Sequence, residues 1–273
     1  YAIKFEKEAE EGKYQYMVTD YPGTIGLRFN FINGGTSGLM SNVKIRKAIS
    51  YSIDREEMID AVYGRYNPAY SYVAPAITFN GSSYRSQVGE VIEDEYNEYV
   101  GDPDKIVALF QEGLDELGVE TPIEDITLTY LTSGSTTEVQ AEREYIQQSL
   151  EETLGLTVEL SVAGDNSLFI ADRNEGNYDF FLGGWYSDYN DPLDFLYTNY
   201  TDAYGMSFGG YSNTDYDALA DQLVGETDMD KRLDIYKQME QILLLDDCAF
   251  APIYYATKQV LLQNWVKDYR TSS

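Results

Sequence analysis

The segment from Ile126 to Val162 decides the fold class of this chain. It reads ITLTYL at 126–131, TEVQAEREYIQQSLEETL at 137–154 and LTVELSV at 156–162. The outer two pieces alternate apolar and polar residues, as strands do, whereas the apolar residues of the middle piece recur at helical spacing. A strand, a long helix and a strand in succession predict a βαβ unit, in which a right-handed crossover joins two parallel strands.

The next predicted strand, at 178–183, runs into the loop GWYSDYNDP at 184–192. In sheets of parallel strands, ligands bind beyond the carboxyl ends of the strands, which is where this loop is expected to lie. Trp185 offers flat apolar surface, and Asp188 offers a carboxylate that can accept hydrogen bonds from an ammonium group. Asp, Asn and Pro also dominate surface turns, so the loop alone is compatible with either role.

Asp191 and Pro192 have a local explanation, because they fit the N-cap and first position of a short helix at 193–197. Asp191 is therefore assigned to structure rather than to ligand binding. A pair of helices is predicted between 41 and 63, with Ser41 capping the first helix and Asp54 the second.

The remaining elements follow from the same signals of periodicity, capping and turn residues. Strands are predicted at 14–18, 24–31, 250–255 and 259–262, and helices at 103–117, 214–226 and 230–246.

Composition excludes several kinds of function. The 273 residues contain no histidine, so neither a Ser-His-Asp triad nor an imidazole metal site is possible, and no metal or cofactor is predicted. Cys248 is the single cysteine, which rules out an internal disulfide, and it is expected to be buried. The net charge of −28 disfavours contact with nucleic acid and anionic membranes.

An enzyme that uses two carboxylates, such as a carbohydrate-active enzyme, is one alternative, and Asp215 and Asp217 form such a pair. With 47 acidic residues in the chain, pairs of this kind arise by chance. The chain is therefore predicted not to be an enzyme.

Three motifs, in order along the chain, resemble the oligopeptide- and dipeptide-binding family of solute-binding proteins that serve ABC importers. The loop at 184–192 resembles the family's W-x-x-D-Y-x-D-P stretch, and GYSNTDYDAL at 210–219 resembles its G-Y-x-N-x-x-Y-D-x-L segment. VKIRKAISYSIDREEMI at 43–59 resembles V-R-x-A-x-x-x-A-I-D-R-x-x-I, from which Lys44 and Ser52 depart.

The resemblance implies an α/β fold: the C-terminal lobe of a periplasmic-binding-protein-like structure, with a mixed or parallel sheet flanked by helices. Strands from the other lobe would flank this unit. We expect residues 1–38 to be residual strands of the N-terminal lobe and the hinge, 39–250 to form the ligand-binding lobe, and 251–273 to return toward the other lobe. Because members of the family are longer, the chain is expected to be a C-terminal portion lacking most of the first lobe.

The resemblance also implies a role: capture of peptides between two lobes for delivery to the membrane subunits of an ABC permease. Asp188 would receive the α-ammonium group of the ligand, and Trp185 and Tyr186 would line the same pocket. Arg173 would face the ligand or its carboxylate. A monomer without nucleic-acid partners is expected, either lipid-anchored at the extracellular face of the membrane or in the periplasm.

Other ligands remain open within the same resemblance: a nickel chelate, haem, glutathione or an oligosaccharide. A sensor whose loaded form docks on a signalling partner would use the same closed state as a transport receptor. The sequence does not specify the length or side chains of a peptide ligand.

Overall fold

The computed structural model describes residues 2–201 and 208–269, and it confirms the α/β fold class. The predicted βαβ unit is present as β5 (Thr127–Ser133), α7 (Thr137–Leu154) and β6 (Thr157–Ala163), with β5 and β6 parallel. Ile146, Leu150 and Leu154 form the buried face of α7, as their helical spacing predicts.

Within the described residues, the main sheet has the order β2-β8-β1-β7-β5-β6 and is mixed. β7 (Phe180–Tyr186) runs parallel to β5, whereas β1 (Gln15–Phe29) pairs antiparallel with both β7 and β8 (Phe250–Leu262). The two-residue strand β2 (Asn67–Pro68) closes one edge against β8.

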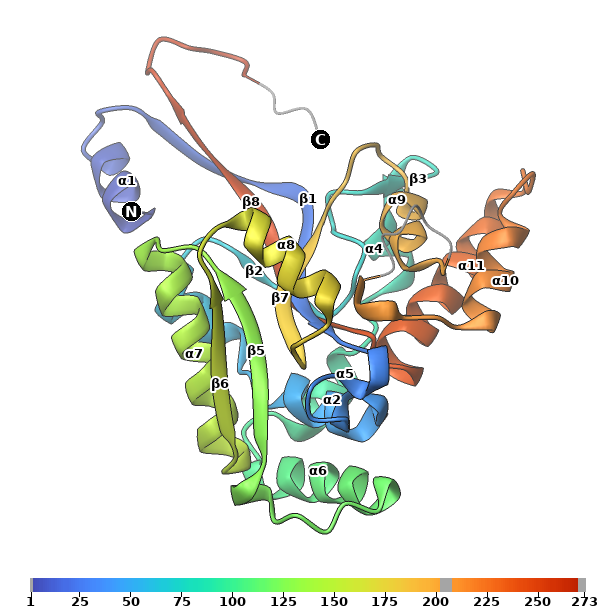
Figure 1. Ribbon diagram of the computed structural model, residues 1–273. Coiled ribbons are helices and arrows are strands. Elements are labelled where there is room, and N and C mark those ends of the chain that lie inside the picture. Colours follow the sequence, from blue (N-terminus) through green and yellow to red (C-terminus); the bar gives the residue numbers. More distant parts are fainter. Residues whose placement is uncertain (1, 202–207, 270–273) are drawn as a thin grey trace.

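Helices cover both faces of this sheet (Figure 1). α7 packs against β6, and α8 (Asn166–Glu175) packs against β5 and β6 from the opposite face. The crossover from β5 to β6 and the crossover from β6 back to β7 run in opposite directions across the sheet, so right-handed connections place their helices on opposite faces. The other α-helices are α1 (Ala2–Glu10), α2 (Val43–Tyr51), α3 (Arg55–Met58), α4 (Tyr84–Val88), α5 (Glu93–Tyr99), α6 (Pro103–Leu117), α9 (Pro192–Leu196), α10 (Thr214–Gln222) and α11 (Met229–Gln241).

Short elements complete the fold. A hairpin is formed by β3 (Thr78–Phe79) and β4 (Ser82–Ser83). Single π-helical turns extend α3 and α11, at Ile59–Tyr63 and Ile242–Asp246. The 3-10 turns lie at Ile32–Gly34, Leu39–Ser41, Ile123–Asp125, Tyr197–Asn199 and Phe208–Gly210.

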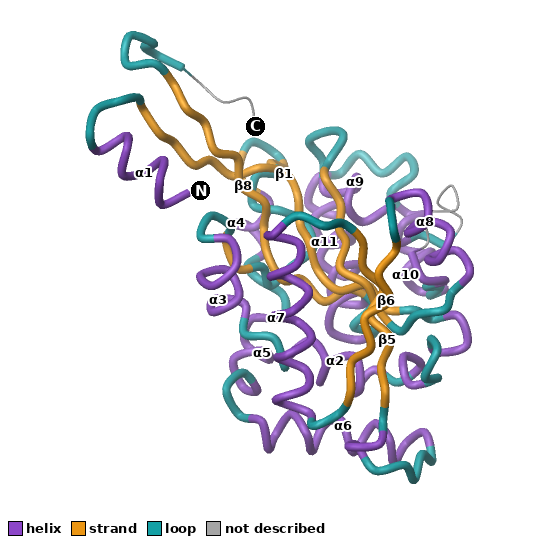
Figure 2. Tube along the Cα trace, turned by 60° about the vertical axis from the view of Figure 1, so that its left-hand side comes forward, coloured by secondary structure: helices purple, strands orange, loops and turns teal. Residues whose placement is uncertain are grey.

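β1 and β8 are longer than predicted. Each was expected as two strands, but each is continuous. The pairing of β1 with β8 shifts register between Asp20 and Thr24, and this shift accommodates the residues that were expected to separate the two parts. The outer part of β1 pairs with the outer part of β8 in a two-stranded ribbon that projects from the helices and sheet, with α1 beside it (Figure 2). No described helix has the length and apolar character needed to cross a membrane.

The predicted division at 38 and 251 stays a prediction. Within the described residues, the inner parts of β1 and β8 belong to the same sheet as β5, β6 and β7. Residue 1 of the predicted N-terminal segment lies outside the described residues. Residues 270–273 of the predicted return segment do so too.

The arginines of the 43–59 motif are structural. Arg55 is fully buried; its Nε donates to the carbonyl oxygen of Pro252 at 2.7 Å, and its guanidinium carbon lies 4.2 Å from the Tyr96 ring centroid. Arg46 donates through Nε to the carbonyl oxygen of Asp247 at 3.1 Å. Both side chains therefore tie the helix pair to β8 and the turn before it.

Asn42, not Ser41, caps α2. The Asn42 side chain accepts hydrogen bonds from the backbone of Lys44 and Ile45, whereas the Ser41 hydroxyl donates to the Gly38 carbonyl. Residues 39–41 form a 3-10 turn, so Asn42 is the residue with the extended backbone that an N-cap requires. The predicted cap at Asp54 is present and accepts from the backbone N–H of Glu57. Cys248 is buried, as expected.

Candidate ligand-binding site

The loop after β7 begins beyond Tyr186 and ends at α9. The Asp191 carboxylate accepts from the backbone N–H of Leu193 at 2.8 Å, which confirms it as the N-cap of α9, and Pro192 follows as the first helical residue. The loop therefore enters a helix at once, and its course is set by its own sequence.

Contacts from both sides fix the backbone of this loop. The backbone N–H of Ser187 donates to the carbonyl oxygen of Pro22 at 2.7 Å, and the Asn190 amide oxygen accepts from the backbone N–H of Thr78 at 2.8 Å. The side chains of Asp188 and Tyr189 remain exposed between these anchors. A held backbone with exposed functional side chains is what a ligand-binding loop requires.

Asp188 presents a free carboxylate to solvent. Among the described residues, this carboxylate has no hydrogen bond or ion pair, and its side chain is exposed. Its backbone N–H donates instead to Oδ2 of Asp194 at 2.9 Å. The negative charge of Asp188 is therefore available to a partner that approaches from outside this part of the chain.

Trp185 combines core packing with a polar contact. The indole ring is partly buried against the main core, and its Nε1–H donates to Oδ2 of Asp194 at 2.8 Å. Residue 185 pairs with Thr24 across the β1–β7 ladder, so the sheet sets the position of its backbone, and the bond to Asp194 holds the ring. The indole thus forms a wall that is fixed beside the Asp188 backbone.

Tyr186 points to the other side of β7 and lines a groove of about 360 Å³. Tyr21, Tyr66 and Lys258 also line this groove, and the Tyr21 and Tyr186 ring centroids are 5.8 Å apart. Gly23 makes room for the ring, because a Cβ there would lie 2.4 Å from Tyr186 Cδ1. Burial raises the pKa of the Tyr186 hydroxyl above its ordinary value.

A group of packed tyrosines supports this groove. The Tyr66 and Tyr254 rings are stacked with centroids 4.5 Å apart, and Tyr63 lies 4.8 Å from Tyr66. The Tyr63 hydroxyl donates to the Glu142 carboxylate. Burial raises the pKa of Glu142 to about 7, although the bond from Tyr63 opposes this change.

Arg173 lies apart from the other predicted site residues. It occupies the last turn of α8, close enough to Tyr178 for its charge to lower the pKa of that tyrosine, which burial raises to about 12. Tyr178 precedes β7, whereas Asp188 follows it. The structure therefore brings Trp185, Tyr186 and Asp188 to one end of β7 and places Arg173 at the other.

Sequence reasoning missed Asp194. This residue is only 7% exposed, and one of its oxygens joins Trp185 to the Asp188 backbone. The available signal was an acidic residue three positions after an N-cap, where it interacts with the first turn of a helix.

Negative charge is concentrated around the loop. The pKa of the Tyr189 hydroxyl is raised, mainly by burial. The negative charges of Asp194, Asp191 and Asp188 add to this effect. Of these three carboxylates, that of Asp191 forms an ion pair with Arg232, whose Nη2 lies 3.8 Å from Oδ2. The site therefore has a net negative charge and favours a cationic group.

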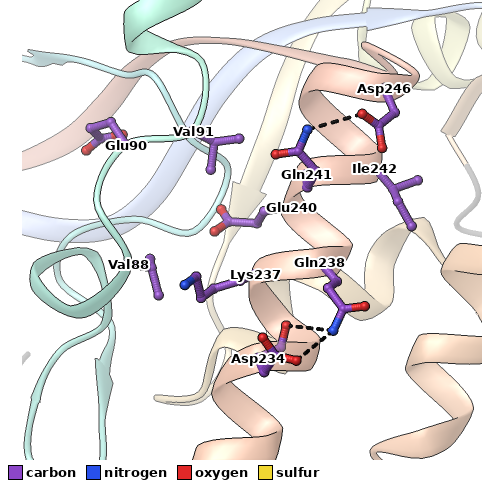
Figure 3. Close-up of a pocket in the computed structure, with 10 residues that line it drawn as sticks. All are labelled: Val88, Glu90, Val91, Asp234, Lys237, Gln238, Glu240, Gln241, Ile242 and Asp246. Atoms are coloured by element: carbon purple, nitrogen blue, oxygen red, sulfur yellow. Dashed lines mark hydrogen bonds between the residues drawn. The ribbon is translucent and has the colours of Figure 1, made fainter.

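Another pocket, of about 520 Å³, lies between the segment after α4 and helix α11 (Figure 3). Lys237 and Val88 lie on its opposing walls, and the buried Glu240 at its base holds Arg85. No predicted site residue lines it. In the part of the chain that the structure describes, no cluster of three Asp, Glu or Cys residues has the arrangement of a metal site.

Comparison with known proteins identifies the family. Residues 2–207 match the family described as bacterial extracellular solute-binding proteins, family 5 Middle. Oligopeptide-binding protein OppA of Bacillus subtilis is 31% identical over 84% of this chain and 39% of its own length. Dipeptide-binding protein DppE of the same organism is 30% identical over 90% of this chain and 42% of its own.

A solved structure agrees with these relatives. Listeria monocytogenes OppA bound to peptide is 30% identical, with a TM-score of 0.76 over 97% of this chain and 49% of that one. The chain thus spans about half the length of these three relatives, or less. A more distant match is heme-binding protein A of Haemophilus influenzae, 26% identical over 84% of this chain.

These findings confirm the resemblance drawn from the three motifs, and they agree with the prediction of a binding protein rather than an enzyme. The family match extends over most of the chain, and the fold of the solved relative covers nearly all of it. The chain belongs to the bacterial extracellular solute-binding proteins of family 5.

Proposed function

We propose that this chain forms the ligand-holding part of a peptide receptor and that Asp188 binds the α-ammonium group of the peptide. The observation that carries this proposal is the free, exposed Asp188 carboxylate on a loop whose backbone is held at Ser187 and Asn190. A carboxylate in this state accepts charge-assisted hydrogen bonds from an ammonium group without first breaking a bond of its own.

Trp185 and Tyr186 complete the proposed site on either side of the strand end. The indole of Trp185 supplies a fixed apolar wall, and the Tyr186 groove supplies aromatic surface for a neighbouring part of the peptide. Arg173 stays a proposed contact for the ligand carboxylate, at a distance of one strand length from Asp188. The names of OppA and DppE, which bind oligopeptides and dipeptides, support the choice of a peptide.

In this account the receptor releases its peptide to the membrane subunits of an ABC permease and works as a monomer outside the cytoplasmic membrane, lipid-anchored or in the periplasm. The family's description as extracellular supports that location. Capture would involve closure of a second lobe over the Asp188 loop, as hinge-bending receptors do.

Haem is the alternative that one relative's name favours. The chain has no histidine to ligate haem iron, and its exposed carboxylate is suited to an amine rather than to the propionates of haem. A peptide is therefore the better match to the residues of this site.

Native mass spectrometry of the full-length natural protein tests this proposal. The expected result is that peptides co-purify with the protein and are released from it when the collision energy is raised. Nearly all of them should have a free amino terminus. Recovery of haem, a sugar or only amino-blocked peptides would contradict it.

A further inference from the structure

Asp194 is a buried carboxylate whose hydrogen bonds all lead to the proposed site. It occupies the third position of α9 and is 7% exposed. Its Oδ2 accepts both the indole N–H of Trp185, at 2.8 Å, and the backbone N–H of Asp188, at 2.9 Å. Burial of a carboxylate is costly unless it is compensated by hydrogen bonds, and here one compensating donor is the Trp185 side chain at the end of β7 and the other is the backbone of the loop that follows.

The element that carries Asp194 is itself rigidly held. Asp191 caps α9 and accepts a hydrogen bond from the Tyr236 hydroxyl at 2.8 Å, and Arg232 approaches the same carboxylate. The buried side chains of Phe195 and Leu196 fix the helix to the core. Asp194 therefore reaches the loop from a firm support, and its two bonds tie the Trp185 indole and the Asp188 backbone to that support.

The charge of Asp194 also bears on the ligand. Within the described residues, no cation is paired with it, so its negative charge adds to that of Asp188. Because Oδ2 of Asp194 lies 2.9 Å from the Asp188 backbone nitrogen, a cation bound at Asp188 is attracted by both carboxylates. A neutral group at the same place gains less from Asp194 than a cation does.

We propose that Asp194 is a positioning residue, which holds the Trp185 indole and the Asp188 backbone as one unit and makes that unit selective for a cationic end of the ligand. The selectivity rests on the proposed function, whereas the positioning does not. The two parts are therefore tested separately.

Positioning is tested by NMR on the chain labelled with nitrogen-15. Trp185 and Trp265 give two indole N–H signals, which a Trp265→Phe variant assigns; Trp265 is 78% exposed and serves as the internal reference. In Asp194→Ala, the Trp185 indole proton is expected to exchange with solvent at least about tenfold faster, since it loses a bond to a charged acceptor. The Trp265 signal should not change.

Asp194→Asn keeps the volume and one acceptor oxygen but removes the charge. It is expected to shift the Trp185 indole signal upfield with an intermediate exchange rate, and it carries the test if Asp194→Ala fails to fold by circular dichroism. Unchanged exchange in a folded Asp194→Ala chain, or an unchanged indole signal in Asp194→Asn, would overturn the positioning role.

Selectivity is tested in the full-length natural protein with tetra-alanine and N-acetyl-tetra-alanine as probes. The ratio of their dissociation constants should fall about tenfold in Asp194→Ala. Asp234→Asn, which removes one negative charge from an exposed position of α11, should leave this ratio unchanged. An unchanged ratio in Asp194→Ala beside an altered indole signal would refute selectivity alone. If the wild-type protein binds neither peptide, the proposed function fails and the selectivity with it.

Discussion

The Tyr63 hydroxyl donates a hydrogen bond to the Glu142 carboxylate, although the two residues lie 79 positions apart in the sequence. The π-helical turn at 59–63 packs against α7, and Tyr63 is one of the tyrosines that support the groove at Tyr186. The partly buried carboxylate makes the stability of this region dependent on pH.

The pKa of Glu142 is raised to about 7 in the folded chain, from an ordinary value of 4.5. Between these values the folded state binds the proton more tightly than the unfolded state does. The contribution of Glu142 to stability is therefore lost progressively as the pH rises from about 4.5 to 7. Its removal should flatten that slope.

Glu142→Gln is accordingly expected to raise the free energy of unfolding at pH 8 by about 1–2 kcal/mol and to have little effect at pH 4.5. Urea denaturation at several pH values measures this, with Glu144→Gln, an exposed site on the same helix, as control. If Glu142→Gln changes the free energy of unfolding by the same amount at every pH, the raised pKa of Glu142 is refuted.

Arg55 bridges α3 to β8 through the Pro252 carbonyl and has no exposed surface. Arg55→Ala leaves buried carbonyl oxygens without donors and is expected to cost about 3 kcal/mol of unfolding free energy. Lys231→Ala, at a side chain that is 67% exposed, should change it by less than about 0.5 kcal/mol. Similar losses in the two variants would argue against the structural role of Arg55.

Gly184 of β7 pairs with Ile25 of β1. A Cβ at this position would lie 1.9 Å from the Thr24 carbonyl oxygen, which is backbone and cannot move without opening the ladder. Gly184→Ala is therefore expected to lower the melting temperature by several degrees. Gly164→Ala, whose Cβ would meet only Leu168 Cδ1 at 3.4 Å, should be nearly neutral, and a neutral Gly184→Ala would contradict this account.

The features that could be predicted from sequence were those set by neighbouring residues. The alternation at 126–131 and 156–162, the helical spacing at 137–154 and the caps at Asp54 and Asp191 each depend on residues a few positions apart. The place of the loop beyond β7 followed from the general behaviour of parallel strands.

What could not be predicted depends on contacts between distant segments. The continuity of β1 comes from its pairing with β8, more than 200 residues away, which overrides the local interruption after Asp20. The bond from Asp194 to Trp185 requires α9 to fold back over the end of β7. Local patterns do not encode either arrangement.

The central claim is that Asp188 binds the amino terminus of a peptide, and the most direct measurement is calorimetry of Asp188→Asn in the full-length natural protein. Because the side chain is exposed, stability should not change. Affinity for tetra-alanine should fall at least about thirtyfold, since breaking a desolvated charge pair from one side costs about 2–5 kcal/mol, while N-acetyl-tetra-alanine should bind as it does to wild type. Undiminished affinity of Asp188→Asn for tetra-alanine would contradict the account.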